Sequence, residues 1–362
     1  MSRLNEDVDN LRAALAWSRD HFDEAFELGL QLCGALGWYW LLGGRLREGR
    51  TWCEAILARA GGRGDAVSRG LAQQATARLA RAQGDIGLAS THVEAAVTTF
   101  RSLGQAQLLA GALTLMSRVR VYQGDPQAAL TVIAEIRQLL PEPHDEADRM
   151  RHVRLGFYEG RALAAKGDLD AARSCYERHL AMLGGPHLRF LFGSALGDLA
   201  FAQGDESRAD ALLRQALPGM QADYASSQWD LALLMVNLGF SKLRHGDLED
   251  AAQLLTDSLR KWLDQGVRAG IGLAMRGLGG VAAARGDAHQ AGLLCGVSTQ
   301  WMSASDAFLL EARGAAAAAE RCLADARARS DLAAFDHGWT TGVSLPGPDS
   351  INLALQTSGL RR

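Results

Sequence analysis

Lysine is scarce in this chain of 362 residues. Only three of its 38 basic residues are lysines (Lys166, Lys242 and Lys261), and 41 acidic residues leave a formal net charge of −3. Binding to the phosphate backbone of nucleic acids requires a strongly basic surface. We therefore expect no direct contact with nucleic acid.

Cysteine is also infrequent, and its spacing matches no known framework. The five cysteines are far apart, and none forms a C-x-x-C pair. An odd number of scattered cysteines favours neither a disulfide framework nor a zinc site. We expect small buried thiols on helix faces, in a protein of the reducing cytoplasm. The five positions are Cys33, Cys53, Cys175, Cys295 and Cys322.

Catalytic signatures are missing as well. The sequence contains no H-E-x-x-H, no G-x-S-x-G and no G-x-x-x-x-G-K-[ST] motif, so it indicates neither metal, cofactor nor nucleotide chemistry. His152 and Asp148, four residues apart on one expected helix, are the only acid–histidine pair that suggests a general base. We therefore predict no catalytic residue, no metal and no cofactor, although enzymatic activity stays open.

Long apolar runs are absent. The longest, from Leu28 to Leu42, contains Gln31 and is shorter than the roughly 20 residues that a membrane span needs. The first ten residues are polar and acidic, unlike a secretory leader. We expect a cytoplasmic protein without membrane contact.

What the chain does contain is a Gly-Asp pair repeated at intervals of 40, 43, 37, 42 and 40 residues. Such a period is typical of a solenoid, in which each repeat is one supersecondary unit stacked on the next. The six pairs begin at Gly84, Gly124, Gly167, Gly204, Gly246 and Gly286, and Gly43-Gly44 precedes them by a similar interval.

Each repeat has the pattern of a helical hairpin. In Arg161–Leu183, apolar residues at spacings of three and four lie on both sides of Gly167-Asp168, which predicts two amphipathic helices joined by a tight turn. The glycine suits the left-handed position that ends a helix, and the aspartate can cap the next one. We predict an N-terminal helical unit over residues 1–60, helical repeats over 61–330, and a C-terminal cap and tail over 331–362.

Both ends of the chain resemble a known family. The segments LNEDVDNLRAALAW (4–17), LGWYWLLGGRLREGRTWCEAIL (36–57) and LAAFDHGWTTGVSLPGPDSINLAL (332–355) resemble the C-terminal tetratricopeptide-type region of bacterial regulators in the STAND ATPase class, including LuxR-like and SARP-like members. The resemblance implies an all-α, tetratricopeptide-like α-solenoid, wound as a right-handed superhelix of about seven repeats. This sequence shows neither a phosphate loop nor a DNA-binding domain. The resemblance therefore does not extend to ATP hydrolysis or to DNA binding.

In such a superhelix the first helix of each pair lines the concave face. Six residues before the turn glycine stand Arg78, Arg118 and Arg161, which we call the basic track, followed by Asp198 and Phe240 in later repeats. Arginine presents a planar fork that suits carboxylate or phosphate. The track therefore indicates a site for an anion, unless these arginines only pair with acidic neighbours or cover the stack.

Other residues are expected on the same face. Arg154 and Arg276 add charge, while the aromatic residues suggest an apolar floor beside it, with ordinary packing between helices as the alternative. These aromatic residues are Phe157, Phe201, Trp229 and Phe240. The group Trp38, Tyr39, Trp40 and Trp52 is expected in the core.

These features favour an interaction or ligand-sensing module related to transcriptional regulators. Its partner would be a protein, an acidic peptide or an anionic small molecule in the concave groove. Two other hypotheses stay open: a helical repeat recruited as an enzyme for a small molecule in a biosynthetic pathway, and a scaffold that forms homodimers through its ends.

Overall fold

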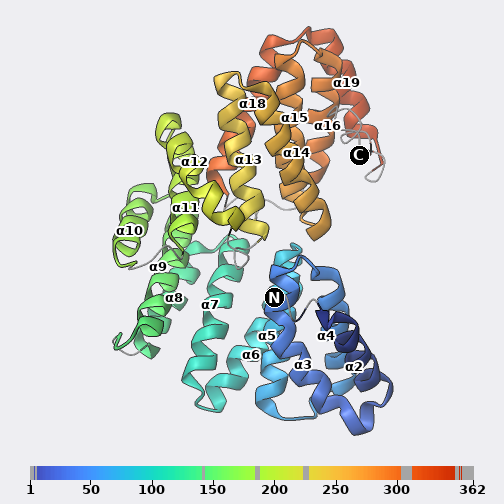
Figure 1. The fold of residues 1–362 in the computed structure, drawn as a ribbon, viewed down its shortest axis with the longest axis vertical. Helices are drawn as coiled ribbons and strands as arrows, with labels where there is room; N and C mark the ends of the chain where they lie inside the picture. Colours follow the sequence, from blue (N-terminus) through green and yellow to red (C-terminus); the bar gives the residue numbers. More distant parts are fainter. Residues whose placement is uncertain are drawn as a thin grey trace. The chain divides into compact units, whose positions relative to one another are not determined.

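The computed structural model describes residue 4, the ranges 6–140, 143–183, 188–222, 228–302 and 312–346, and residues 350 and 352. Within these ranges all regular structure is helical, in 17 helices without a strand. The chain divides into two compact units, Met1–Lys166 and Gly167–Arg362 (Figure 1). The predicted all-α, tetratricopeptide-like α-solenoid fold is confirmed.

Unit 1 is a series of antiparallel helices in which each helix packs against its neighbours in sequence. Its helices are α2 (Val8–Asp20), α3 (Phe22–Leu42), α4 (Leu46–Ala60), α5 (Ala66–Ala82), α6 (Ile86–Ser102), α7 (Ala106–Tyr122), α8 (Pro126–Leu139) and α9 (Glu146–Lys166). Helix α3 also packs against α5, and α7 against α9. The first helices of successive repeats therefore adjoin and form one continuous face.

Unit 2 has the same hairpin pattern up to α16, and its last two helices depart from it. Its helices are α10 (Leu169–Ala181), α11 (Arg189–Ala202), α12 (Glu206–Ala222), α13 (Gln228–His245), α14 (Leu248–Gln265), α15 (Arg268–Ala284), α16 (Ala288–Met302), α18 (Arg313–Arg329) and α19 (Leu332–Ser344). Helices α11, α13 and α15 are the first helices of three consecutive repeats, and α12, α14 and α16 are their partners.

The Gly-Asp turns have the predicted conformation. All six glycines adopt φ between 79° and 95°, a left-handed region that a side chain makes costly. At the first turn, the Gly84 N–H donates to the Arg81 carbonyl (3.0 Å) and the Asp85 N–H donates to the Ala80 carbonyl (2.9 Å). This pair of hydrogen bonds is the Schellman motif, which satisfies the last carbonyls of a helix.

Most of the turn aspartates also cap the following helix. The carboxylates of five of them accept a hydrogen bond from the N–H three residues later, at 2.8–3.3 Å. These five are Asp85, Asp125, Asp168, Asp205 and Asp287. The sixth, Asp247, makes no such bond and instead accepts from Lys242 Nζ at 2.9 Å. The predicted capping role is confirmed at five turns and wrong at Asp247, where a neighbouring lysine takes the carboxylate.

The last helices depart from the expected continuation of the stack. Helix α18 does not extend the stack of hairpins but packs against α11, α13 and α15. Helix α19 packs against α16, where Gly292 and Gly296 of one helix face Gly338 and Gly342 of the other so closely that a methyl group on any of them would overlap the opposite backbone.

The boundaries near residues 60 and 330 stay a prediction, and most of the expected tail after residue 346 lies outside the described residues. All five cysteines are buried and form no disulfide. Among the described helices, none is both long and apolar enough to cross a bilayer.

Asp287 caps the following helix and Asp247 does not, so substituting each in turn tests the contribution of the cap to stability. We expect Asp287→Ala to lower the free energy of unfolding by about 1 kcal/mol, because it removes an N-cap bond to the Gln290 N–H. Asp247→Ala should cost less than about 0.5 kcal/mol, because its exposed ion pair with Lys242 contributes little. Urea unfolding of both variants measures the difference; equal losses would contradict the assignment of the caps.

Candidate ligand-binding site

The described residues form a pocket of about 260 Å³ in unit 2 and a larger one of about 450 Å³ in unit 1. The unit 1 pocket lies on the face formed by α3, α5, α7 and α9, and the end of α8 closes one side. Most of its lining is apolar, with leucines from α3, α7, α8 and α9. A largely apolar cavity with a few charged groups is typical of a ligand site.

The charged groups of this pocket are all of one sign. Four arginines line it (Arg78, Arg118, Arg151 and Arg154), and none of the residues described as lining it is acidic. Arg78, Arg118 and Arg154 were expected on this face from the sequence, and the structure brings them together. Arg151 was not expected; it forms an ion pair with Asp148, one turn earlier on α9.

Arg78 is the least solvated of the four. Its side chain lies on the inner face of α5 and the residue is 9% exposed. No hydrogen bond or ion pair joins it to the described residues; its guanidinium carbon instead lies 4.2 Å from the ring centroid of Trp38. Burial lowers the pKa of Arg78 to about 10, and the charges of Arg81 and Arg118 act in the same direction. At neutral pH the side chain is still charged, and its burial disfavours this charged form.

The other side of the pocket contains a similar pair. The Arg118 guanidinium on α7 lies 5.3 Å from the ring centroid of Tyr158 on α9. Cation–π contacts of this kind hold a guanidinium in place over an aromatic ring. Two stacked arginines therefore approach one cavity from α5 and α7, and the exposed Arg154 does so from α9.

Trp38 corrects an expectation. We expected it in the core with its neighbours, but it is 48% exposed and lines the pocket, whereas Tyr39 and Trp40 are buried. A signal in the sequence could have revealed this, because Trp38 stands six residues before Gly44, as Arg78 stands six before Gly84. The indole occupies the inward register position of the first repeat.

The histidine pair does not form. His152 Nδ1 lies 3.0 Å from the backbone oxygen of Asp148, not from its carboxylate. That carboxylate accepts from the His144 N–H and pairs with Arg151, and both interactions lower the pKa of Asp148, the backbone bond most. The suggested general base is therefore not assembled, because the carboxylate serves as a local anchor at the start of α9.

The remaining candidates of unit 1 lie outside the described pocket lining. Phe157 and Arg161 are both buried, and the Arg161 guanidinium stacks 4.7 Å from the Phe157 ring centroid. The third member of the basic track is thus on the same helix as Tyr158 but engages an aromatic ring one turn away.

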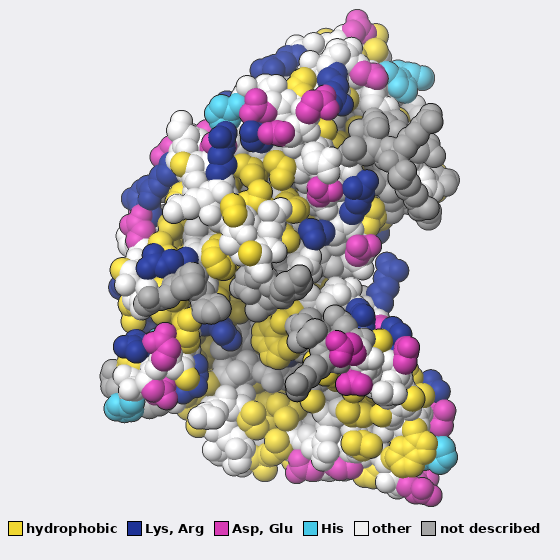
Figure 2. Space-filling model, viewed as in Figure 1, with side chains coloured by type: hydrophobic (Ala, Val, Ile, Leu, Met, Phe, Trp, Pro, Cys, Tyr) yellow, Lys and Arg dark blue, Asp and Glu magenta, His cyan; other side chains and the backbone are white. Residues whose placement is uncertain are grey.

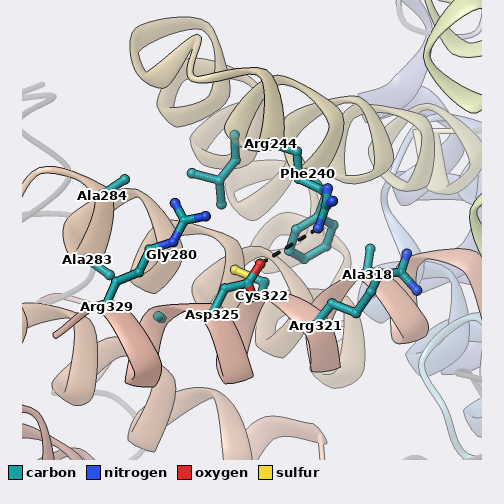
Figure 3. A pocket seen from close by; sticks show the side chains of 12 residues that line it. Phe240, Arg244, Gly280, Ala283, Ala284, Ala318, Arg321, Cys322, Asp325 and Arg329 are labelled. Carbon is teal, nitrogen blue, oxygen red and sulfur yellow. Dashed lines mark ion pairs between the residues drawn. The ribbon is translucent and has the colours of Figure 1, made fainter. Parts of the chain in front are cut away.

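The candidates in unit 2 fall into two groups. Phe201 and Trp229 are core residues; Phe201 is fully buried and Trp229 packs edge-on against Trp262. Asp198, Phe240 and Arg276 face α18: Asp198 accepts from two of its backbone N–H groups, and Arg276 pairs with Glu320. Phe240 lines the smaller pocket together with α18 residues (Figure 3).

The second helices of the repeats carry charges of both signs. On the face in Figure 2, basic and acidic side chains are interspersed along the outer edge. Many arginines on the second helices pair with acidic residues of the adjacent repeat, as Arg101 does with Glu135 at 2.6 Å and Arg208 with Glu177 at 2.8 Å. Exposed pairs of this kind balance the surface charge and contribute little stability.

Comparison with known proteins finds relatives in sequence for part of the chain. No protein-family model matches the chain. It is 30% identical over 186 residues to proteins named "Putative HTH-type transcriptional regulator" from Mycobacterium tuberculosis and Mycobacterium bovis. The match covers 49% of this chain and 20% of each relative, so the chain matches only about a fifth of their length.

A solved structure matches along nearly the whole chain. The crystal structure of a Rap protein complexed with competence and sporulation factor superposes with a TM-score of 0.50, covering 99% of this chain and 98% of that one. Because the sequences are only 13% identical, the likeness concerns the fold.

The unusual state of Arg78 gives a stability test without a ligand. We expect Arg78→Met to leave the melting temperature unchanged or to raise it, because an apolar side chain of similar length removes a buried charge without an anionic partner. Arg276→Met should lower it, because that buried guanidinium pairs with Glu320 and with Ser298 Oγ (3.0 Å). Calorimetry of both variants checks this; a loss at Arg78 matching that at Arg276 would mean that Arg78 is structural.

Proposed function

We propose that this chain is a ligand-binding repeat module of a bacterial regulatory protein, and that it binds an acidic peptide or another carboxylate-bearing molecule in the pocket of unit 1. One observation carries the proposal: a buried arginine without an anionic partner lies in a cavity that four arginines and no acidic side chain line. A bound carboxylate would supply the missing counter-charge.

The residues that line the pocket of unit 1 indicate which other groups the ligand would carry. Leucines from four helices would receive an apolar side chain, while Arg78 and Arg118 would each donate to carboxylate oxygens from opposite sides. A cavity of about 450 Å³ accommodates a few residues of a peptide or one metabolite of moderate size. The preferred ligand therefore combines a carboxylate with an adjacent apolar group.

The similar proteins support a ligand-binding role. The Rap protein was solved in complex with competence and sporulation factor, and we propose that the present chain also binds a ligand, on its inner face. The partial match to transcriptional regulators supports a role as the sensing arm of a regulator of the STAND, LuxR-like or SARP-like kind. Binding energy in such an arm would be used to shift a conformational equilibrium.

The test is direct titration with defined peptides. We would measure binding calorimetrically to short peptides with free C-termini, in which one or two acidic residues flank a leucine or phenylalanine. We expect Arg78→Met and Arg118→Met each to weaken the best binder at least tenfold, since a charge-assisted hydrogen bond is worth about 1.5–3 kcal/mol. Affinity should also fall as the salt concentration rises.

Arg120 provides the matched control. It lies on the same helix as Arg118 but pairs with Glu94 at 3.1 Å, outside the pocket lining. Arg120→Met should therefore leave the affinity within about twofold of the wild type. Equal effects of Arg118→Met and Arg120→Met, or binding that does not respond to either pocket substitution, would rule out this site.

A further inference from the structure

Helix α18 lies where a ligand of unit 2 would be expected. It packs against α11, α13 and α15, the first helices of three consecutive repeats (Figure 1). In unit 1 the equivalent face carries the pocket. The same register applies in both units: the residues six positions before the turn glycines of unit 2 are Asp198, Phe240 and Gly280, and all three contact or line the space beside α18.

The beginning of α18 is held by Asp198. Its two carboxylate oxygens accept from the backbone N–H groups of Gly314 and Ala315, each at 3.0 Å. Asn237 on α13 donates to the same carboxylate at 3.0 Å, which orients it. The approach is so close that a Cβ on Gly314 would overlap the backbone carbonyl of Asp198. A residue on α11 thus supplies the N-cap of a helix more than a hundred positions later in the sequence.

The middle of α18 is held by α15. Arg276, which is 4% exposed, pairs with Glu320 of α18. The thiol of Cys322 lies 3.6 Å from the Arg276 carbonyl oxygen, and a Cβ on Gly280 would overlap its sulfur. These contacts fix the position of α18 along the groove through single polar groups and two close glycines.

The apolar contribution to this contact is small. The buried face of α18 consists of alanines, Gly314 and Cys322, and each such side chain buries much less apolar surface than a leucine. A cavity of about 260 Å³ remains between α18 and the helices α13 and α15, with Ala318, Cys322 and Asp325 along one side (Figure 3). Helix α18 is therefore positioned by specific polar contacts and close glycines, and a cavity is left beside it.

We propose that the inner face of α11, α13 and α15 is a helix-binding groove, and that α18 is its resident, exchangeable ligand. The partner that replaces it is a helix with the same pattern: a stripe of small residues, a first turn whose N–H groups reach Asp198, and an acidic residue six positions further for Arg276. Larger apolar side chains in that helix would fill the cavity and favour exchange.

The experiment supplies α18 in trans. A fluorescently labelled synthetic peptide of residues 312–330 is titrated into the full chain, and binding is followed by anisotropy. In the variant Gly314→Ala the chain's own α18 meets the Asp198 carbonyl and leaves the groove, so the peptide should bind at least tenfold more tightly than to the wild type. A peptide that itself carries Gly314→Ala should not bind.

Gly193→Ala is the matched control for the host chain. Gly193 lies on α11, and an added methyl group there would make only an ordinary contact with Ala216. This variant should bind the peptide as the wild type does. Tighter peptide binding by both Gly314→Ala and Gly193→Ala, or by neither, would overturn the proposal.

A reversible lock tests the same exchange in the opposite direction. Gly280→Cys places a second thiol against Cys322, so oxidation should join α15 to α18 by a disulfide. The oxidised protein should not bind the peptide, whereas the reduced protein should bind it. Adding Cys322→Ser removes the lock while keeping the new cysteine, and oxidation should then have no effect.

Hydrogen exchange of the wild type tests whether α18 leaves the groove, even if Gly314→Ala fails to fold. Amides of α18 should exchange at least tenfold faster than those of α13 and α15, because the groove retains its structure when α18 leaves. Exchange of all three helices in one cooperative step would show that α18 is an integral part of the unit 2 core and would overturn the proposal.

Discussion

The inner surface of this protein depends on how each helical hairpin turns. The left-handed glycine and the two hydrogen bonds of the Schellman motif fix where the first helix ends, and this sets the rotation of that helix relative to its partner. The residue six positions earlier faces the inner surface in six repeats, whereas Arg161 in the same position stacks on Phe157 outside the pocket lining. Trp38, Arg78 and Arg118 occupy this position in unit 1, and Asp198, Phe240 and Gly280 occupy it in unit 2.

One backbone register thus serves two different surfaces. In unit 1 the inward residues are one tryptophan and two arginines, and they line a cavity in which burial disfavours the charge of Arg78. In unit 2 the inward residues include an acid that caps α18 and a glycine that lets it approach. The chemistry of a single position per repeat therefore separates a face suited to an anion from a face occupied by a helix.

The comparisons fit this separation of fold from function. A Rap protein shares the helical architecture at 13% identity, because stacked amphipathic hairpins need only small residues and an apolar stripe at suitable positions. The match to transcriptional regulators covers about half of this chain. What distinguishes one repeat array from another is the set of side chains on its inner face, and these follow the ligand rather than the fold.

Local sequence determined the helices, the turns and the register, because the left-handed glycine, the capping aspartate and the apolar periodicity act within a few residues. It was therefore possible to place Arg78, Arg118 and Arg154 on one face from sequence alone. The same reasoning assigned Trp38 to the core, since a tryptophan next to buried aromatic residues looks apolar until its register is counted from Gly44.

Only the tertiary structure decided what each inward residue faces. The capping of α18 by Asp198 joins residues more than a hundred positions apart, and alanine periodicity alone could not distinguish a helix at the end of the stack from one lying across it. The pairing of Asp148 with Arg151 rather than with His152 was similarly a matter of side-chain direction. Local patterns fix which way a side chain points from its own helix, whereas its partner depends on contacts between distant segments, and the energies of those contacts are not encoded in any short stretch of sequence.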